Sequence, residues 1–305
     1  MRLLITGVAG FIGSKIAEAA VSRGYDVIGV DDLSQGHLYN VPKECEFLNF
    51  DLVDSKYIDY LPKNIDVILH LAGQSSGEIS FDNPIADLEK NAISTLNLIN
   101  YGIKNKIRKI VHASSMSVYG STIDIPIKEE YDCAPLSCYG VGKLAAENYL
   151  KIYKNILPYI SFRMFNVYGP GQDLGNMRQG MVSIYVAQAL KNQFINVKGS
   201  LNRFRDYIYI DDVVAMWLKS IENDQLNNNV FNLGTGVKTT VVQLLNYIKN
   251  NIHTVNWKEI ENTPGDQFGI YADIGKMSQY FEYKSFVPIV EGLKKFIVWA
   301  EKFNK

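Results

Sequence analysis

The stretch from Arg2 to Gly13 reads Arg-Leu-Leu-Ile-Thr-Gly-Val-Ala-Gly-Phe-Ile-Gly, an apolar run that ends in three glycines spaced three residues apart. The apolar part predicts a short buried strand, and the pattern beyond the glycines predicts a helix to about Arg23. Glycines in such a strand–turn–helix unit permit a tight turn and let backbone N–H groups approach a pyrophosphate at the helix N-terminus. A merely structural turn is the alternative, but the context favours a dinucleotide-binding site at Gly7, Gly10 and Gly13.

A pair of carboxylates follows the second predicted strand, which covers Asp26 to Val30. Asp31 lies about twenty residues beyond the glycines, where a carboxylate accepts hydrogen bonds from the hydroxyls of the adenosine ribose. The same carboxylate would repel a 2′-phosphate, so Asp31 predicts NAD rather than NADP as the cofactor. The alternative is that this aspartate only forms a turn.

Alternating strand and helix patterns continue through the first half of the chain. Further strands are expected at 45–49, 66–71 and 109–113 with helical segments between them, which predicts an α/β fold with a Rossmann-type doubly wound parallel sheet. Asp51 follows the third strand, where it could contact adenine. His70 is expected to be a packed strand residue rather than a catalyst. The helix predicted from Pro84 to Ile103 carries an apolar face that could serve a dimer.

Two segments carry candidate catalytic groups. Ser114 and Ser115 end a predicted strand at the carboxyl edge of the sheet, where ligands bind. Tyr139 and Lys143 are four residues apart and share one face of a predicted helix. A phenol titrates near ~10, but an ammonium one turn away is expected to lower that pKa and make Tyr139 a general acid/base. Tyr-x-x-x-Lys also occurs by chance on many helices, and hydroxyls at strand ends often only form turns.

The composition excludes several classes of protein. The 305 residues are 47% hydrophobic and 21% charged with a net charge of −1, which gives no electrostatic reason to expect nucleic acid or an anionic membrane as a partner. No apolar run is long enough to span a membrane, and Met1 runs directly into a strand pattern, so we expect a cytoplasmic protein without a signal peptide. Cys45, Cys133 and Cys138 lack metal-site spacing, so we expect reduced thiols and no metal.

These motifs occur together in one order and at closely fitting spacings. The glycines, Asp31, His70-Leu-Ala-Gly73, Ser114-Ser115 and Tyr139…Lys143 are followed by Arg163-Met-Phe-Asn166, Arg205-Asp-Tyr, Phe231-Asn-Leu-Gly234 and Pro264-Gly-Asp266. The set resembles the extended short-chain dehydrogenase/reductases, in particular the NAD-dependent nucleotide-sugar epimerases typified by UDP-glucose 4-epimerase. The resemblance covers nearly the whole chain.

The resemblance implies a catalytic trio of Ser115, Tyr139 and Lys143, with NAD as cofactor and a nucleotide-diphosphate sugar as substrate. Together, the motifs and the resemblance predict these NAD contacts: Gly7, Gly10, Phe11, Ile12, Gly13, Asp31, Asp32, Ser34, Asp51, Leu52, Leu71, Ala72, Gly73, Asn91, Ser114, Tyr139 and Lys143. The predicted substrate contacts are Gln74, Ser115, Asn166, Arg178, Arg205 and Asp266.

The sequence departs from the family pattern where the substrate diphosphate is held. Epimerases of this kind usually carry an arginine shortly before the Gly-Asp pair, and Glu261-Asn-Thr263 stands here instead. Met181 stands where an asparagine is usual. Arg178, in the segment Gly175-Asn-Met-Arg-Gln-Gly180, is a candidate to replace the missing charge. A solvated loop arginine is an equal alternative.

The resemblance also implies a split domain arrangement. The NAD-binding domain would take residues 1–165 and 211–234, and a smaller α/β substrate domain would take 166–210 and 235–305. In the second half we expect helices at 180–191, 211–221, 240–249 and 289–303, and strands at 194–198 and 229–233. A homodimer is the expected assembly.

The leading hypothesis is epimerisation at C4 of the sugar through a transient 4-keto intermediate. A C4 dehydrogenase that releases the 4-keto sugar would show the same trio and stays open as an alternative. A non-catalytic NAD-sensing protein would be expected to have lost Tyr139 or Lys143. Sugar 4,6-dehydratases carry an Asp-Glu pair after the catalytic hydroxyl residue, whereas Met116 and Ser117 follow Ser115 here, so no dehydration is expected.

Overall fold

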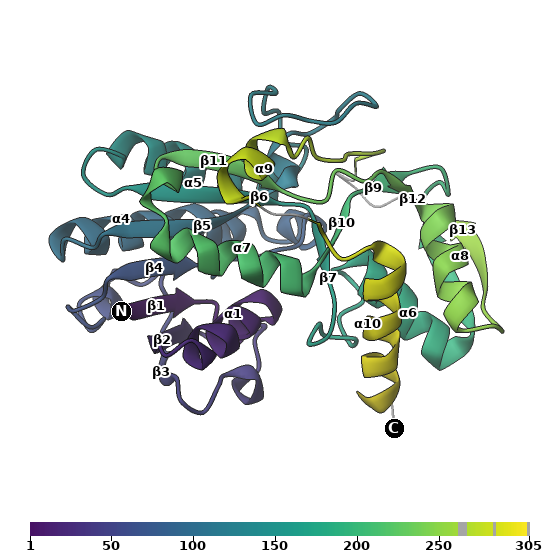
Figure 1. The fold of residues 1–305 in the computed structure, drawn as a ribbon, viewed down its shortest axis with the longest axis horizontal. Coiled ribbons are helices and arrows are strands. Elements are labelled where there is room, and N and C mark those ends of the chain that lie inside the picture. Colours follow the sequence, from purple (N-terminus) through teal and green to yellow (C-terminus); the bar gives the residue numbers. More distant parts are fainter. Residues whose placement is uncertain (262–266, 283–284, 304–305) are drawn as a thin grey trace.

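A parallel seven-stranded sheet forms the centre of the molecule (Figure 1). The structure is a computed structural model that describes residues 1–261, 267–282 and 285–303. The strand order is β11-β6-β5-β4-β1-β2-β3, and every pairing is parallel. The strands are β1 (Arg2–Thr6), β2 (Asp26–Asp31), β3 (Glu46–Asn49), β4 (Val67–His70), β5 (Lys109–Ser115), β6 (Tyr159–Met164) and β11 (Asn229–Leu233).

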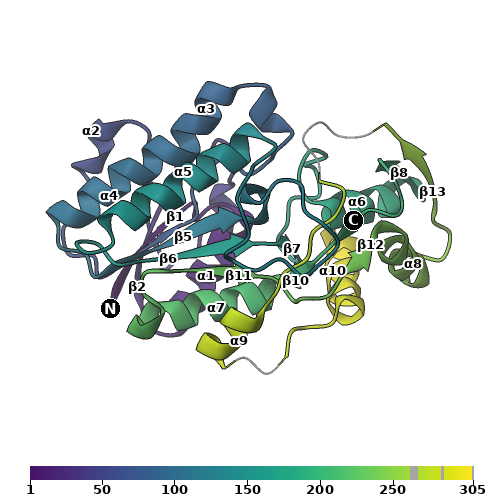
Figure 2. The same cartoon turned by 90° about the horizontal axis from the view of Figure 1, so that it is seen from above.

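Helices cover both faces of this sheet, as Figure 2 shows. One face carries α1 (Phe11–Ser22), α7 (Ile210–Glu222) and α9 (Gly275–Phe281), and the other carries α2 (Ser55–Ile58), α4 (Ser94–Lys104) and α5 (Cys138–Tyr153). Successive residues of a strand point to opposite faces, so Leu3 packs in the cluster under α1 and α7, while Leu4 packs in the cluster under α4 and α5. Burial on both faces explains why the strands are continuously apolar.

A second, smaller group of elements packs beyond the carboxyl ends of the strands (Figure 1). Its core is a separate apolar cluster built largely from three helices, in which Val186, Leu244 and Phe296 are fully buried. The helices are α6 (Met181–Asn192), α8 (Val241–Asn251) and α10 (Ile289–Phe303). Three two-stranded sheets join them, made of β7 (Asn166–Tyr168) with β10 (Tyr207–Tyr209), β9 (Phe204–Arg205) with β12 (Thr239–Thr240), and β8 (Phe194–Lys198) with β13 (Asn256–Ile260).

The predicted doubly wound α/β fold is confirmed. Within residues 1–165, the structure differs from the expected elements in two places. The helix expected from Pro84 to Ile103 is present as α3 (Pro84–Leu88), a π-helical turn (Glu89–Ile93) and α4. The central strand β6 was missed, because its buried Ser161 and Arg163 interrupt the apolar run. The predicted domain division stays a prediction; α9, from the region assigned to the substrate domain, packs beside β11.

A buried ion pair fastens α5 to the sheet. The Arg163 guanidinium on β6 donates to the Glu147 carboxylate on α5, with Nη2 2.7 Å from Oε2, and both side chains are more than nine-tenths buried. Nη1 of the arginine also donates to the carbonyl oxygen of Glu129 at 2.9 Å. Ser114 on β5 donates its hydroxyl proton to the same carboxylate. This network fixes the helix that carries Tyr139 and Lys143 against strands β5 and β6.

Replacing Glu147 by Gln should therefore lower the free energy of unfolding by about 3–5 kcal/mol, because the Arg163 charge would stay buried without its carboxylate. Urea denaturation of the cofactor-free protein measures this. The matched control is Asp59→Asn, which breaks an exposed pair with Lys104 and should cost about 0–1 kcal/mol. Equal losses in the two variants would contradict the structural role of the buried pair.

Candidate active site

A cavity of about 430 Å³ opens at the carboxyl ends of β1, β2 and β4. Its floor is the turn between β1 and α1, where a side chain is excluded by close backbone contacts: a Cβ at Gly13 would lie 2.1 Å from the Gly7 carbonyl oxygen. Gly7 itself has a φ of +70°, in the left-handed region that favours glycine. No side chain caps the N-terminus of α1, so its first N–H groups face the cavity as an anion-binding end.

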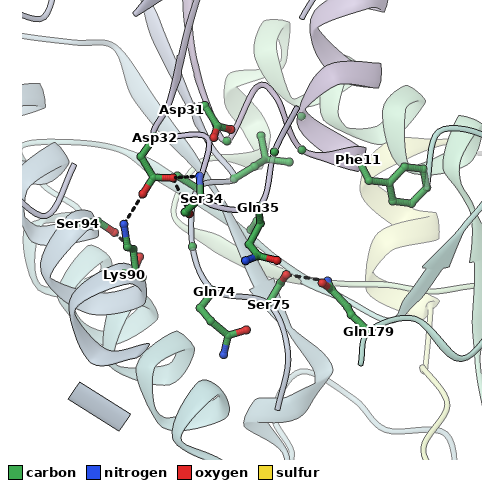
Figure 3. A pocket seen from close by; sticks show the side chains of 18 of the residues that line it. Phe11, Asp31, Asp32, Ser34, Gln35, Gln74, Ser75, Lys90, Ser94 and Gln179 are labelled. Atoms are coloured by element: carbon green, nitrogen blue, oxygen red, sulfur yellow. Dashed lines mark hydrogen bonds and ion pairs between the residues drawn. The ribbon is translucent and has the colours of Figure 1, made fainter. Parts of the chain in front are cut away.

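Asp31 and Asp32 occupy the β2 edge of this cavity, as Figure 3 shows. The Asp31 carboxylate accepts hydrogen bonds from the backbone N–H groups of Ala9 (3.0 Å) and Leu33 (2.9 Å), and its burial raises its pKa. Burial also acts to raise the pKa of Asp32, but hydrogen bonds from Lys90 and Ser34 outweigh it and hold that pKa below its usual value. The two carboxylates are therefore held rigidly at the end of β2.

Lys90 is a functional candidate that the sequence analysis missed. Its ammonium pairs with Asp32 and with Asp51, 3.0 Å from Oδ2 of the latter, and all three residues line the cavity. Lys90 lies in the π-helical turn, a feature that often marks functional sites. A single lysine on a long helix gives no sequence signal, because its partners lie in the loops that follow β2 and β3.

Tyr139 and Lys143 enter the same cavity from the first turns of α5. Ser137 begins this helix by accepting a hydrogen bond from the Gly140 N–H at 3.2 Å. Both side chains are buried, and the Lys143 Nζ atom lies 5.9 Å from the centre of the Tyr139 ring. Ser115, at the end of β5, shares a hydrogen bond with Tyr139. The structure thus brings the predicted trio together.

The pKa of Tyr139 differs from the lowered pKa that the sequence predicts. Burial raises the pKa of Tyr139 to about 12, against the lowering effect of the hydrogen bond with Ser115. Burial also lowers the pKa of Lys143 to about 8, although the nearby Asp87 carboxylate opposes this. The predicted net lowering of the tyrosine pKa therefore does not hold for the protein alone, because loss of hydration outweighs the hydrogen bond with Ser115 and the Asp87 carboxylate raises the pKa further.

Asp87 and Asn91 lie near Lys143, and Asp87 also lines the cavity. Asp87 Oδ1 accepts from Gln74 Nε2 (2.7 Å) and from Asn91 Nδ2 (3.2 Å). Asp87 Oδ2 and Asn91 Oδ1 are buried without a hydrogen-bond partner among the described residues. Buried acceptors of this kind are expected to receive donors. Hydroxyl-bearing NAD, with its pyrophosphate at the glycine turn, fits these residues.

The predicted NAD contacts fall into two groups. Asn91 and Ser114 do not line the cavity: Asn91 packs behind Gly73, and the Ser114 hydroxyl points to Glu147, because successive residues of β5 face opposite ways. Gln74, predicted as a substrate contact, lines this cavity instead. The predicted residues that do line it are Gly7, Gly10, Phe11, Ile12, Gly13, Asp31, Asp32, Ser34, Asp51, Leu52, Leu71, Ala72, Gly73, Tyr139 and Lys143.

A second cavity of about 480 Å³ adjoins the first, and Ser75 and Gln179 line both. Asn166 and Arg205, both predicted substrate contacts, line its wall. The buried Arg205 guanidinium donates to the carbonyl oxygens of Gln267 (2.6 Å), Phe204 (2.8 Å) and Phe268 (3.2 Å). Backbone carbonyls thus hold the guanidinium beside the cavity.

Arg178 lies on the rim of the second cavity, but it is not a solitary cation. Its guanidinium pairs with Glu78 and Asp82, which come from the loop after β4. The expectation that Arg178 is a spare charge for the diphosphate therefore needs correction, because two carboxylates already hold it. Asp266 lies outside the described residues.

His70 is a packed strand residue, as predicted. Its ring nitrogens lie 2.8 Å from the Thr6 hydroxyl and 2.9 Å from the Thr95 hydroxyl, and full burial lowers its pKa to about 3. The three cysteines are free thiols. Over residues 1–261, 267–282 and 285–303, no cluster of His, Cys, Asp or Glu could hold a metal ion, and no helix has the length and apolarity to cross a bilayer.

Comparison with known proteins gives one consistent result. Residues 3–234 match the sequence model of the NAD dependent epimerase/dehydratase family. The chain is 36% identical to the UDP-glucose 4-epimerase of Mycolicibacterium smegmatis over 253 residues, 80% of each chain. The structure of UDP-glucose 4-epimerase from Thermotoga maritima with UDP-glucose superposes with a TM-score of 0.96, at 32% identity and 100% coverage of both chains. The complex of the Thermus thermophilus UDP-glucose 4-epimerase with NAD gives 0.92, at 29% identity and 99% coverage of both.

The depressed pKa of Lys143 predicts how a substitution at this position changes the free energy of unfolding. Lys143→Met should raise the free energy of unfolding of the cofactor-free protein at pH 7 by up to about 3 kcal/mol, because it removes a buried charge. The gain should shrink as the pH rises from about 8 towards ~10.5, since the native lysine is then neutral while the unfolded lysine is still protonated. Urea denaturation at pH 7 and about pH 9.5 measures the difference. A gain of equal size at both pH values would contradict the depressed pKa.

Proposed function

Since the chain belongs to the NAD-dependent epimerase/dehydratase family, we propose that it inverts C4 of a nucleotide-diphosphate sugar through a transient 4-keto intermediate. The observation that carries this proposal is the position of the trio. Tyr139 and Lys143 line the cofactor cavity, and the residues that follow Ser115 line the adjoining cavity with Asn166 and Arg205. A sugar placed at this junction would present its carbinol to both the phenol and the cofactor.

In this proposal Tyr139 accepts the proton of the C4 hydroxyl and later returns it, while Ser115 donates a hydrogen bond to the reacting oxygen. NAD, when bound by the residues that line the first cavity, would supply reversible hydride transfer. Because the pKa of Tyr139 is about 12 in the protein alone, the site must favour the phenolate by the Ser115 hydrogen bond and the Lys143 ammonium. Lys143 also interacts electrostatically with Asp87, and both residues line the cavity where a ribose hydroxyl would bind.

The second cavity supports binding of the nucleotide diphosphate. The Arg205 guanidinium lines this cavity, and Asn166 lines it from β7, with its amide nitrogen 3.1 Å from the Asp206 carbonyl oxygen. Charge-assisted hydrogen bonds to a diphosphate are among the stronger polar contacts. The UDP-glucose bound in the Thermotoga maritima structure makes UDP-hexoses the first substrates to test.

We also propose that the protein is a homodimer through α3 and α5. Exposed apolar side chains lie on these neighbouring helices and just beyond the end of α5: Ile85 is 71% exposed, Val141 52%, Ile152 70% and, after α5, Ile156 64%. Contiguous apolar surface of this kind marks protein–protein contacts, and burying it against a second copy would remove it from water.

The proposed function is tested by incubating the purified protein and NAD with UDP-glucose or UDP-galactose and following the C4 configuration by NMR. The unmodified protein should interconvert the two sugars. Tyr139→Phe should lower the turnover number by ~10²–10⁴ because it removes the proton-transferring hydroxyl, and it should leave NAD binding nearly unchanged. Turnover at the unmodified rate by the Phe variant would contradict the role of Tyr139.

The mass of the product separates epimerisation from its nearest alternatives. A product of unchanged mass with inverted C4 supports the proposal. A product lighter by two hydrogens would identify a C4 dehydrogenase instead. A product lighter by one water would identify a dehydratase, although Met116 lacks a proton to transfer and Ser117 is a weak base.

A further inference from the structure

Two loops that lie far apart in sequence meet over the junction of the two cavities. One loop, 75–82, follows β4, and the other, 172–180, follows β7. Gln179 donates its amide proton to the Ser75 hydroxyl at 2.7 Å, a contact visible in Figure 3. Ser76 donates its hydroxyl proton to the Arg178 carbonyl oxygen at 3.0 Å. We call this contact between the two loops the loop bridge.

Ion pairs reinforce the loop bridge, and Glu78 is their centre. Glu78 Oε1 lies 3.3 Å from Arg178 Nε, and Glu78 Oε2 lies 3.0 Å from Nζ of Lys198 on β8. Arg178 Nη1 also lies 2.7 Å from Asp82 Oδ2. Both carboxylate oxygens of Glu78 are thus occupied by cations, so Glu78 is a poor candidate for a general base. Glu78 thus joins the loop after β4 to two separate segments of the smaller group of elements around α6, α8 and α10. We call this group the smaller lobe.

The loop bridge spans the place where the sugar is proposed to react. Ser75 and Gln179 line both cavities, Asp82 lines only the cofactor cavity, and Glu78, Arg178 and Lys198 line only the second. Tyr139 lies in the cofactor cavity, and Met116 and Ser117, which follow Ser115, lie in the second. A molecule that reaches both the Tyr139 phenol and the second cavity must therefore contact the loop bridge or pass it.

We infer that Glu78 is a positioning residue that keeps the loop bridge closed while the 4-keto intermediate turns over. This inference rests on the proposed function. When the carbinol has lost its hydride to NAD and its proton to Tyr139, the resulting ketone has no covalent bond to the protein. Only the cavity walls retain it until the hydride returns. If the bridge opens first, the ketone leaves and the cofactor stays behind as NADH.

The strength of the ion pairs sets the size of the expected effect. The Glu78 side chain is 24% exposed, whereas Arg178 and Lys198 are 43% and 44% exposed. Partly exposed pairs contribute little individually, so a bridge made of several can open readily enough for substrate entry. Loss of the two pairs of Glu78 should raise the opening frequency about three- to tenfold. A rise of this size in the opening frequency is large enough to measure, and the loss of two partly exposed ion pairs is small enough to leave the fold intact.

The experiment compares Glu78→Gln with the unmodified protein during turnover of UDP-glucose. Borodeuteride trapping measures the free 4-keto sugar, and absorbance of the enzyme measures the NADH left behind. The variant should release about three- to tenfold more ketone per turnover and accumulate NADH. Arg178→Gln should behave alike, and the double variant should be little worse than either single one, because both break the same unit. The matched control is Asp59→Asn, which removes an exposed pair remote from the cavities and should change neither quantity.

A second measurement does not need sugar turnover. Ser75, Asp82 and Gln179 of the loop bridge also line the cofactor cavity, so Glu78→Gln should speed the release of bound NADH about three- to tenfold when excess NAD displaces it. An unmodified protein that inverts no sugar would refute the proposed function, while NADH release would still report whether the bridge closes the site. The inference is overturned if the variants release ketone and NADH at the unmodified rates. It is also overturned if only the Michaelis constant changes, since Glu78 would then act on substrate binding alone.

Discussion

The close approach of backbone segments at the turn between β1 and α1 determines how the rest of the molecule is arranged. Any side chain at Gly13 would collide with the Gly7 carbonyl, and one at Gly7 would lie 2.7 Å from the backbone nitrogen of Ala72, beyond β4. The first helix can therefore start directly at the end of β1, with its N–H groups open to the cavity. The same turn supplies the Ala9 N–H that orients the Asp31 carboxylate. One steric condition thus fixes a strand pairing, a helix start and one end of the ligand cavity.

Removal from water controls the chemistry of the site more than any single charge does. Burial moves the pKa of Tyr139 upward and that of Lys143 downward, so in the protein alone it disfavours the charged form of each group, although Lys143 still carries its charge at pH 7. Buried, unpaired oxygens at Asp87 and Asn91 add acceptors to the same small volume. A cleft with these properties is costly to keep empty. It gains from a ligand that supplies donors and charge, which is how a protein prepares a site for one cofactor.

Features set by short sequence spacings could be predicted, and features set by long-range contacts could not. The glycine turn, Asp31 and the Tyr139–Lys143 pair depend on neighbours within a helical turn or on regular strand–helix alternation, so the printed sequence was enough. Lys90 pairs with carboxylates in the loops after β2 and β3, and Arg178 pairs with Glu78, which is 100 residues away in sequence. Ser114 was misplaced because the sequence shows its hydroxyl but not the Glu147 carboxylate on the facing helix. Strand β6 was missed because Arg163 is acceptable in a core only through that same partner.

The order of the sheet also affects how the chain is made. Strand β6 pairs on one side with β5, which precedes it directly among the sheet strands, but its other partner is β11. The chain between 165 and 228, which includes α6 and α7, is synthesised before β11. At translation rates of about 5–20 residues per second, the outer edge of β6 stays unpaired for several seconds on the ribosome. An open, apolar strand edge is a template for pairing with other chains. The nascent polypeptide therefore passes through a period in which it depends on chaperones or on low local concentration to avoid aggregation.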